Sequence, residues 1–205
     1  MKKLIIPLLI LMCYLGLAAQ DVKALVVMPN NYGANYQCYY EMFEQLGWDV
    51  TTTAVNATVQ PCSGYAAPLG CPPVTVDILI QDITDVSLYD CVMLMSSSSY
   101  VGNPCIELIN SQAALDLVVA ADNADLILFT SCSSIRVLAA ADVLQGVNVQ
   151  CPSTWQTEIV DAGANCIGQK IPPVIDGNIV STMRGQYYAM QNIYAVLTAI
   201  TALEN

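Results

Sequence analysis

Residues 126–146, LILFTSCSSIRVLAAADVLQG, decide the fold class of this chain, because an apolar run passes directly into an Ala-rich segment. The run Asp125–Thr130 has the length and composition of a buried strand. Ser133–Leu144 carries apolar residues at helical spacing and stops before Gly146, so we expect a helix there. Cys132 stands at the junction. A strand that feeds a helix is half of a β-α-β unit, the building block of parallel sheets.

The same alternation continues outward from this stretch. Val22–Met28 is predicted to be a buried strand, Tyr36–Leu46 a helix that ends at Gly47, and Trp48–Ala54 a second strand. The other predicted elements are the strands Val74–Ile80, Asp90–Met95 and Asn178–Thr182 and the helices Pro104–Ala121, Thr154–Ala162 and Gln186–Leu203. Five or more strands that alternate with helices predict a doubly wound α/β sandwich.

The first twenty residues have the layout of a secretion signal. Two lysines precede the uncharged apolar run Leu4–Leu17, and small residues then offer a cleavage site near Gln20. The alternative is an uncleaved anchor, but the run is short for a transmembrane helix. We therefore expect a signal peptide over residues 1–20 and one domain over residues 21–205. The mature protein is expected to be periplasmic or extracellular, without a membrane segment.

The charge balance excludes several kinds of partner. The chain has 17 acidic and 6 basic residues, a formal net charge of −11, and signal cleavage would remove Lys2 and Lys3 as well. Such an acidic chain lacks the basic surface that binds nucleic acid or anionic lipid.

The cysteines favour disulfides over metal binding. The chain has nine cysteines, and an even number of them lies beyond the predicted signal. The sequence contains no histidine and no Cys-x-x-Cys pair. Zinc sites of the usual spacing are therefore not expected, and nothing in the sequence predicts a cofactor.

Residues 56–73 interrupt the alternation of strands and helices. This stretch is rich in Pro and Gly, with Cys62 in its first half and Cys71 near its end. We interpret it as an inserted surface loop closed by a Cys62–Cys71 disulfide, since exported proteins mature under oxidising conditions. The alternative is that the two thiols are unrelated.

Cys132 is the candidate catalytic residue. A cysteine on a sharp turn between strand and helix has the plan of a nucleophile elbow, which exposes the side chain at the carboxyl edge of the sheet. The start of a helix offers free N–H groups and a partial positive charge, which lower a thiol pKa. The alternative is a buried structural cysteine at the end of a strand.

Four ordered stretches of the sequence resemble one protein family. They are KALVV (23–27) with LGWDVT (46–51), YDCVML (89–94), the elbow with VLAAADVLQG (137–146), and DAGA (161–164) with DGNIVSTMRG (176–185). Together these resemble the ThiJ/PfpI family, also called DJ-one/PfpI, of the class I glutamine amidotransferase-like superfamily. The resemblance implies a flavodoxin-like three-layer α/β/α sandwich with a mostly parallel sheet. It also implies a homodimer.

The sequence departs from this family around the elbow. Ser133 follows the cysteine where the family usually has histidine, and Ser96 and Ser97 follow the strand that usually ends in Pro-Gly-Gly. Asn35 falls where a glutamate normally bonds the cysteine. Without histidine a cysteine–histidine pair is impossible, and Asn35 cannot act as a base. Protease chemistry is therefore not expected.

Cys151 stands where the family often has His or Tyr before a proline. The resemblance places its side chain opposite Cys132, which implies a Cys132–Cys151 disulfide that closes off the nucleophile or acts as a redox switch. The alternative is a disulfide between Cys151 and Cys166 across the intervening helix.

The loops around residues 30–36 and 184–188 are expected at the carboxyl edge of the sheet. They would form a pocket rich in Tyr, Asn and Gln with Arg184 as its cation, suited to a small polar or carbonyl-bearing molecule; alternatively the tyrosines pack against loops. Two functions remain open. The first is a thiol enzyme or redox site that depends on Cys132, with hydrolase- or lyase-type chemistry on small carbonyl compounds. The second is an inactive binding or structural domain on the same fold.

Overall fold

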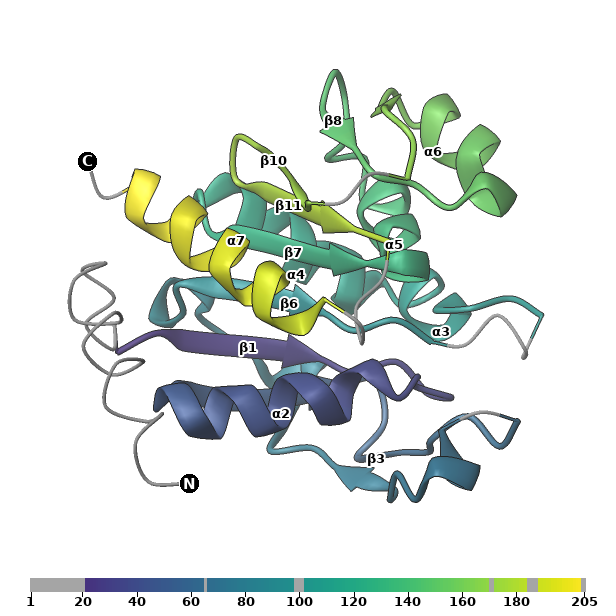
Figure 1. The fold of residues 1–205 in the computed structure, drawn as a ribbon, viewed down its shortest axis with the longest axis vertical. Coiled ribbons are helices and arrows are strands. Elements are labelled where there is room, and N and C mark those ends of the chain that lie inside the picture. Colours follow the sequence, from purple (N-terminus) through teal and green to yellow (C-terminus); the bar gives the residue numbers. More distant parts are fainter. Residues whose placement is uncertain (1–20, 65, 98–101, 170–171, 184–187, 204–205) are drawn as a thin grey trace, which may run out of the picture.

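The computed structural model describes residues 21–64, 66–97, 102–169, 172–183 and 188–203 (Figure 1). Its centre is a seven-stranded sheet with the order β10-β11-β7-β6-β1-β2-β5. The strands are β1 (Lys23–Val27), β2 (Asp49–Ala54), β5 (Ile78–Leu79), β6 (Cys91–Leu94), β7 (Ile127–Ser131), β10 (Val174–Asp176) and β11 (Ile179–Thr182). Every neighbouring pair is parallel except β10 with β11. The prediction of a mostly parallel sheet is confirmed.

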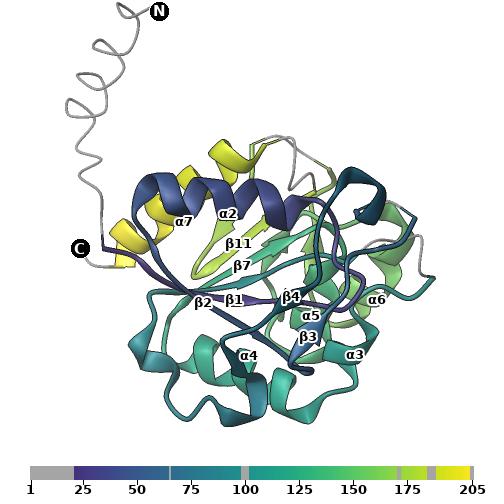
Figure 2. The same ribbon diagram turned by 90° about the horizontal axis from the view of Figure 1, so that it is seen from below.

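Helices cover both faces of the sheet (Figure 2). One face carries α2 (Asn35–Leu46) and α7 (Ala189–Leu203), and the other carries α3 (Ile106–Ile109), α4 (Gln112–Asn123) and α5 (Ile135–Ala140). The helix α6 (Gln156–Asp161) packs against α5. This arrangement is the predicted flavodoxin-like three-layer sandwich.

The alternation of side chains along β1 separates two cores. Ala24 and Val26 belong to the cluster under α2 and α7, whereas Leu25 and Val27 belong to the cluster under α4 and α5. All four side chains are buried, as expected for a parallel strand covered by helices on both faces.

Several short strands and 3-10 helices lie outside the seven-stranded sheet and the main helices. They are the antiparallel pair β3 (Thr58–Val59) and β4 (Val74–Thr75), the parallel pair β8 (Asn148–Val149) and β9 (Asn165–Cys166), and 3-10 helices at Ala67–Leu69, Ile80–Asp82, Val86–Leu88, Cys132–Ser134 and Ser153–Trp155.

Two predicted elements are each divided in the structure. The predicted strand Val74–Ile80 becomes β4 and β5, because the Asp77 carboxylate turns toward β2 and accepts hydrogen bonds from the Thr52 N–H and hydroxyl at 2.8 and 2.6 Å. The predicted helix Pro104–Ala121 becomes α3 and α4, because the Ser111 hydroxyl accepts a hydrogen bond from the N–H of Ala114 and starts a new helix.

One helix boundary and one edge strand also differ from the sequence prediction. The helix after Cys132 ends at Ala140, before the predicted Leu144, because Asp142 has a left-handed backbone with φ of 58°. The edge strand β10 was not predicted. It forms a hairpin with β11, and Gly177 in the turn has φ of 58°, which glycine adopts without steric cost.

Candidate functional site

Cys132 occupies a strained position at the end of β7. Ser131 is the last residue of the strand, and a 3-10 helix begins at Cys132 and leads into α5. The φ angle of Cys132 is 52°, in the left-handed region that residues with a side chain rarely adopt. Such conformations cost on the order of 1–3 kcal/mol and persist where the surroundings hold them. The backbone therefore turns sharply between β7 and the helical segment that follows.

Two serines hold this turn in place. The Ser134 hydroxyl accepts a hydrogen bond from the N–H of Ser131 at 2.9 Å and donates one to the carbonyl of Leu94 at 2.8 Å. The side chain of Ser131 in turn accepts a hydrogen bond from the N–H of Ser134, which completes a capping box. Both serines are fully buried, so the turn is tied to the neighbouring strand β6 without help from solvent.

The Cys132 thiol is half-buried, and its pKa lies above the ordinary thiol value. Burial raises the pKa because a thiolate is poorly solvated there, while the backbone N–H of Ser133 lowers it to a smaller extent. No charged side chain among the described residues contributes. The sequence left open an acidified thiol and a buried structural cysteine, and the direction of the pKa shift favours the second because burial outweighs the N–H of Ser133.

Asn35 lies beside the turn, at the start of α2. Its Nδ2 donates a hydrogen bond to the Ser131 hydroxyl at 3.1 Å, and the side chain is 2% exposed. Its Oδ1 has no hydrogen-bond partner among the described residues and faces Gly33, whose own N–H donates to the carbonyl of Ser96 at 3.0 Å. Asn35 and Ser96 thus both lie against Gly33, and the amide oxygen of Asn35 is buried without a partner among the described residues.

Ser97 and Ser133 meet on the other side of the turn, together with a cysteine that the sequence did not single out. The Ser133 hydroxyl donates to the carbonyl of Ser97 at 2.9 Å. The N–H of Cys105 donates to the Ser97 hydroxyl at 2.7 Å, and the Cys105 Sγ lies 3.7 Å from both serine hydroxyls. Burial raises the pKa of the Cys105 thiol. Cys105 therefore serves as a neutral partner in a buried polar cluster.

Arg136 is a second residue that the sequence analysis missed. It is 5% exposed, and its guanidinium bonds the Glu158 carboxylate, the Asn103 side chain and the Pro104 carbonyl. The guanidinium also stacks over Trp155, 3.9 Å from the ring centroid. In the sequence, the signal for this role was a single basic residue in an otherwise apolar predicted helix. Its contacts fix the segment just before Cys105 against α5 and α6.

The cysteine pairing differs from two of the predictions. A disulfide joins Cys151 to Cys166, which is the alternative that the sequence left open, so Cys151 is not a thiol facing Cys132. Cys62 and Cys71 are both free. The predicted Cys62–Cys71 bond is absent: Cys62 is fully buried, whereas Cys71 is partly exposed and packs against the core under α2 and α7. Backbone hydrogen bonds close the loop, with the N–H of Ala67 donating to the Cys62 carbonyl and the N–H of Cys71 to the Ala66 carbonyl.

The free cysteines of the described chain are Cys38, Cys62, Cys71, Cys91, Cys105 and Cys132. Arg184 and the predicted signal peptide lie outside the described residues. Within the described ranges, no group of three or more His, Cys, Asp or Glu side chains is arranged to hold a metal ion. None of the described helices has the length and apolarity needed to cross a membrane.

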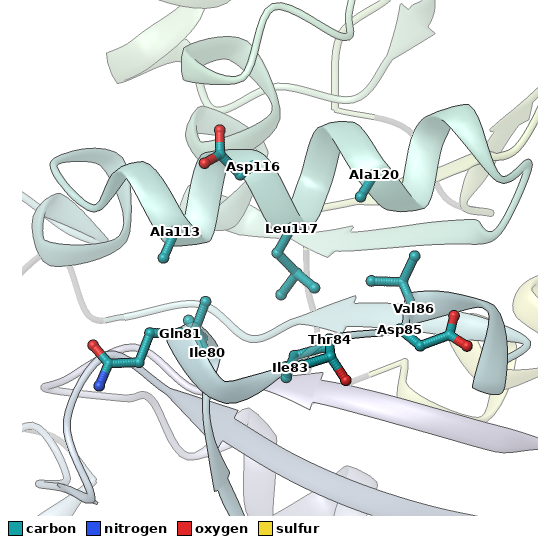
Figure 3. Close-up of a pocket in the computed structure, with 10 residues that line it drawn as sticks. All are labelled: Ile80, Gln81, Ile83, Thr84, Asp85, Val86, Ala113, Asp116, Leu117 and Ala120. Carbon is teal, nitrogen blue, oxygen red and sulfur yellow. The ribbon is translucent and has the colours of Figure 1, made fainter.

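A pocket of 410 Å³ lies away from the elbow, between α4 and the segment that follows β5 (Figure 3). Leu117 of α4 points toward Ile83 and Val86, whereas the Asp116 carboxylate points away from them on the other side of α4. None of the residues that line this pocket is a predicted site residue. The Asp116 carboxylate already accepts a hydrogen bond from Gln112, and Asp85 from Ser87.

Comparison with known proteins identifies the fold. No protein-family model matches the chain, and no curated protein does so either. Among solved structures, a ThiJ/PfpI domain protein from Brachyspira murdochii has a TM-score of 0.70 at 20% identity, covering 89% of this chain and 96% of that one.

Two other solved structures agree with this match. DJ-1beta from Drosophila melanogaster has a TM-score of 0.68 at 16% identity, covering 90% of this chain and 91% of its own. DJ-1 from Toxoplasma gondii, in an oxidised form, has a TM-score of 0.65 at 17% identity, covering 89% and 90%. The chain described here has the flavodoxin-like α/β fold of ThiJ/PfpI and DJ-1 proteins.

Proposed function

We propose that this protein is an exported member of the ThiJ/PfpI family in which Cys132 adds to small carbonyl compounds. The observation that carries the proposal is the left-handed backbone of Cys132, at φ of 52°, at the end of a central parallel strand. In open α/β sheets, small molecules bind at the carboxyl ends of the strands. A conformation of this cost, held by buried serines, is typical of functional positions.

The chemistry requires only one thiol and nearby hydrogen-bond donors. The Cys132 Sγ would bond to the carbonyl carbon, the carbon–oxygen double bond would open, and the thiol proton would move to the carbonyl oxygen. The thiolate is the form of cysteine that attacks, and the proton released from the sulfur is the one that the carbonyl oxygen takes up, so no second acid is required. The N–H of Ser133 favours the thiolate form of Cys132, although burial has the larger effect on the pKa.

The lining of the elbow suits a small, uncharged polar molecule. Serine side chains surround the turn, and those of Ser131, Ser133 and Ser134 are buried there. The chain contains no histidine to act with the cysteine as a base, so peptide-bond hydrolysis is not proposed. A small, uncharged carbonyl compound is therefore the proposed substrate class.

Methylglyoxal provides the test. The mature chain, its Cys132→Ser variant and its Cys62→Ala variant are each incubated with methylglyoxal, and both the consumption of methylglyoxal and the mass of the protein are followed. Cys62 serves as the control because it is also a free cysteine, and its side chain is fully buried. We expect consumption to fall by about a hundredfold or more in Cys132→Ser and to stay unchanged in Cys62→Ala. Equal rates in all three proteins would remove Cys132 from the reaction.

The second candidate function is an inactive binding domain on the same fold. The observation that favours it is the high pKa of the Cys132 thiol, because few thiolates are present at neutral pH. Under this alternative, methylglyoxal is not consumed by any of the three proteins. A small polar ligand would then bind Cys132→Ser and the unchanged protein with the same affinity.

A further inference from the structure

The strongest unexplained feature outside the elbow is a pair of cysteines on two different elements. Cys38 lies in α2, and Cys71 lies at the end of the loop between β3 and β4. Both are free, half-buried and packed against the core under α2 and α7. Figures 1 and 2 both place this loop beside the first turns of α2.

Two contacts bring Cys71 toward Cys38, and an electrostatic effect agrees with them. The hydroxyl of Tyr32 donates to the carbonyl of Pro72, the residue that follows Cys71. The ring of Tyr32 meets the ring of Tyr36 edge to face, with 5.7 Å between the centroids, and Tyr36 belongs to the same first turns of α2 as Cys38. Burial raises the pKa of the Cys38 thiol, and negative charge on Glu41 and on Cys71 raises it further. Such charge effects act only between groups that lie close together.

Cys62 is less suited to be the partner of Cys71. Its side chain is fully buried, its N–H donates to the carbonyl of Tyr32, and its carbonyl accepts from Ala67. It is therefore fixed within the loop, whereas Cys38 and Cys71 are both partly accessible to a solution oxidant.

We propose that Cys38 and Cys71 form a disulfide that fastens the loop of residues 56–73 to α2. Each Sγ loses its proton, the two sulfurs bond to each other, and the two electrons pass to a disulfide oxidant. With oxidised glutathione as that oxidant, two molecules of reduced glutathione are released. This inference does not depend on the reaction proposed for Cys132.

The Cys38–Cys71 bond would restrict the movement of residues next to Cys132. Tyr32 pairs with Pro61 on one side and with Ser97 on the other, and its hydroxyl reaches Pro72. Ser97 belongs to the polar cluster beside Cys132. A link from Cys71 to α2 therefore fixes Tyr32 and, through it, the end of β6 next to the site.

The test is a disulfide map of the whole mature protein. The protein is equilibrated with oxidised glutathione, its free thiols are blocked with N-ethylmaleimide, and it is digested without reductant. Chymotrypsin cuts after Leu69, which is 64% exposed, and so separates Cys62 from Cys71. We expect a peptide containing Cys38 linked to one containing Cys71. A Cys62–Cys71 link, or Cys71 carrying the blocking group, would overturn the inference.

Two matched variants test the mechanical effect of the bond. Cys38→Ala and Cys62→Ala are compared under oxidising conditions, because a reductant would also open Cys151–Cys166. We expect chymotrypsin to cleave folded Cys38→Ala after Leu69 about tenfold faster than folded Cys62→Ala. The reason is that Cys38→Ala lacks the disulfide that holds the loop against α2. Equal cleavage rates, or Cys71 becoming alkylated in Cys62→Ala alone, would contradict the proposal.

Discussion

At Cys132 two physical effects act on the same thiol in opposite directions. Burial favours the neutral thiol, whereas the backbone N–H of Ser133 favours the thiolate, and burial has the larger effect. A cysteine at the start of a helix is therefore not acidic by position alone, because the thiolate also needs solvent or a cation nearby. The one buried guanidinium close in sequence, that of Arg136, is engaged by Glu158, Asn103 and Pro104.

Alkylation of Cys132 as a function of pH measures this balance. In the folded protein we expect the rate with iodoacetamide to keep rising above pH ~8.5, the pKa of an ordinary thiol, because burial raises the pKa. Unfolded protein should show the ordinary midpoint, and peptide masses identify the modified cysteine. A plateau well below that pH in the folded protein would mean that the thiol is acidified after all.

The same shift links Cys132 to stability. A thiol whose pKa is higher in the folded than in the unfolded state stabilises the fold while it is protonated. This contribution is fully present below the ordinary thiol pKa. It is lost as the pH rises through the higher folded pKa, so alkaline solutions weaken the fold at this residue.

Among the elements, the turn from β7 into α5 depends on Ser134. Replacing Ser134 by alanine removes the acceptor of the Ser131 N–H and the donor to the Leu94 carbonyl. Because these groups are buried, we expect Ser134→Ala to lower the free energy of unfolding by about 1–3 kcal/mol. Urea unfolding measures the change.

Ser153→Ala is the control for this prediction. Ser153 also belongs to a 3-10 helix, but it is exposed and its side chain makes no capping hydrogen bond, so its loss should change stability by less than about 0.5 kcal/mol. Equal effects of the two substitutions would show that the hydrogen bonds of Ser134 do not stabilise the turn.

The elements that the sequence predicted well are those with a strong local signal. β1 and β7 are continuous apolar runs, and α2 ends at Gly47, which has φ of 70° and donates its N–H back to the helix. The predictions failed where a single polar side chain overrides the pattern. Asp77 divides one predicted strand and Ser111 one predicted helix, and both act through hydrogen bonds that periodicity does not reveal.

The candidate site was predictable only in part, for a related reason. The resemblance to the ThiJ/PfpI family placed Cys132, Asn35 and the serines after β6 together, which agrees with the rule that parallel strands end at the same edge of a sheet. Cys105 could not, since it joins the cluster through Ser97 and Ser133 by contacts between distant parts of the chain. The pKa of Cys132 depends on how completely its neighbours exclude water, which the sequence does not specify.

At the scale of the whole molecule, the sheet carries two separate cores, one under α2 and α7 and one under α4 and α5. The Cys151–Cys166 disulfide lies on the second side, where Val149 pairs with Cys166 between β8 and β9. The proposed Cys38–Cys71 bond would lie on the first. Disulfides on both sides suit a chain that matures in an oxidising compartment.

Export is the prediction on which this view of the whole molecule depends. We expect the mature protein to begin near Gln20, because a charged start, the apolar run Leu4–Leu17 and small residues precede it. Intact mass and N-terminal sequencing of protein from the exported fraction measure the cleavage point. Leu8→Arg places a charge within the apolar run and should leave an uncleaved precursor in the cell. If the unchanged chain also keeps its first residues and stays inside the cell, its cysteines remain reduced, and the proposed disulfide loses its oxidant.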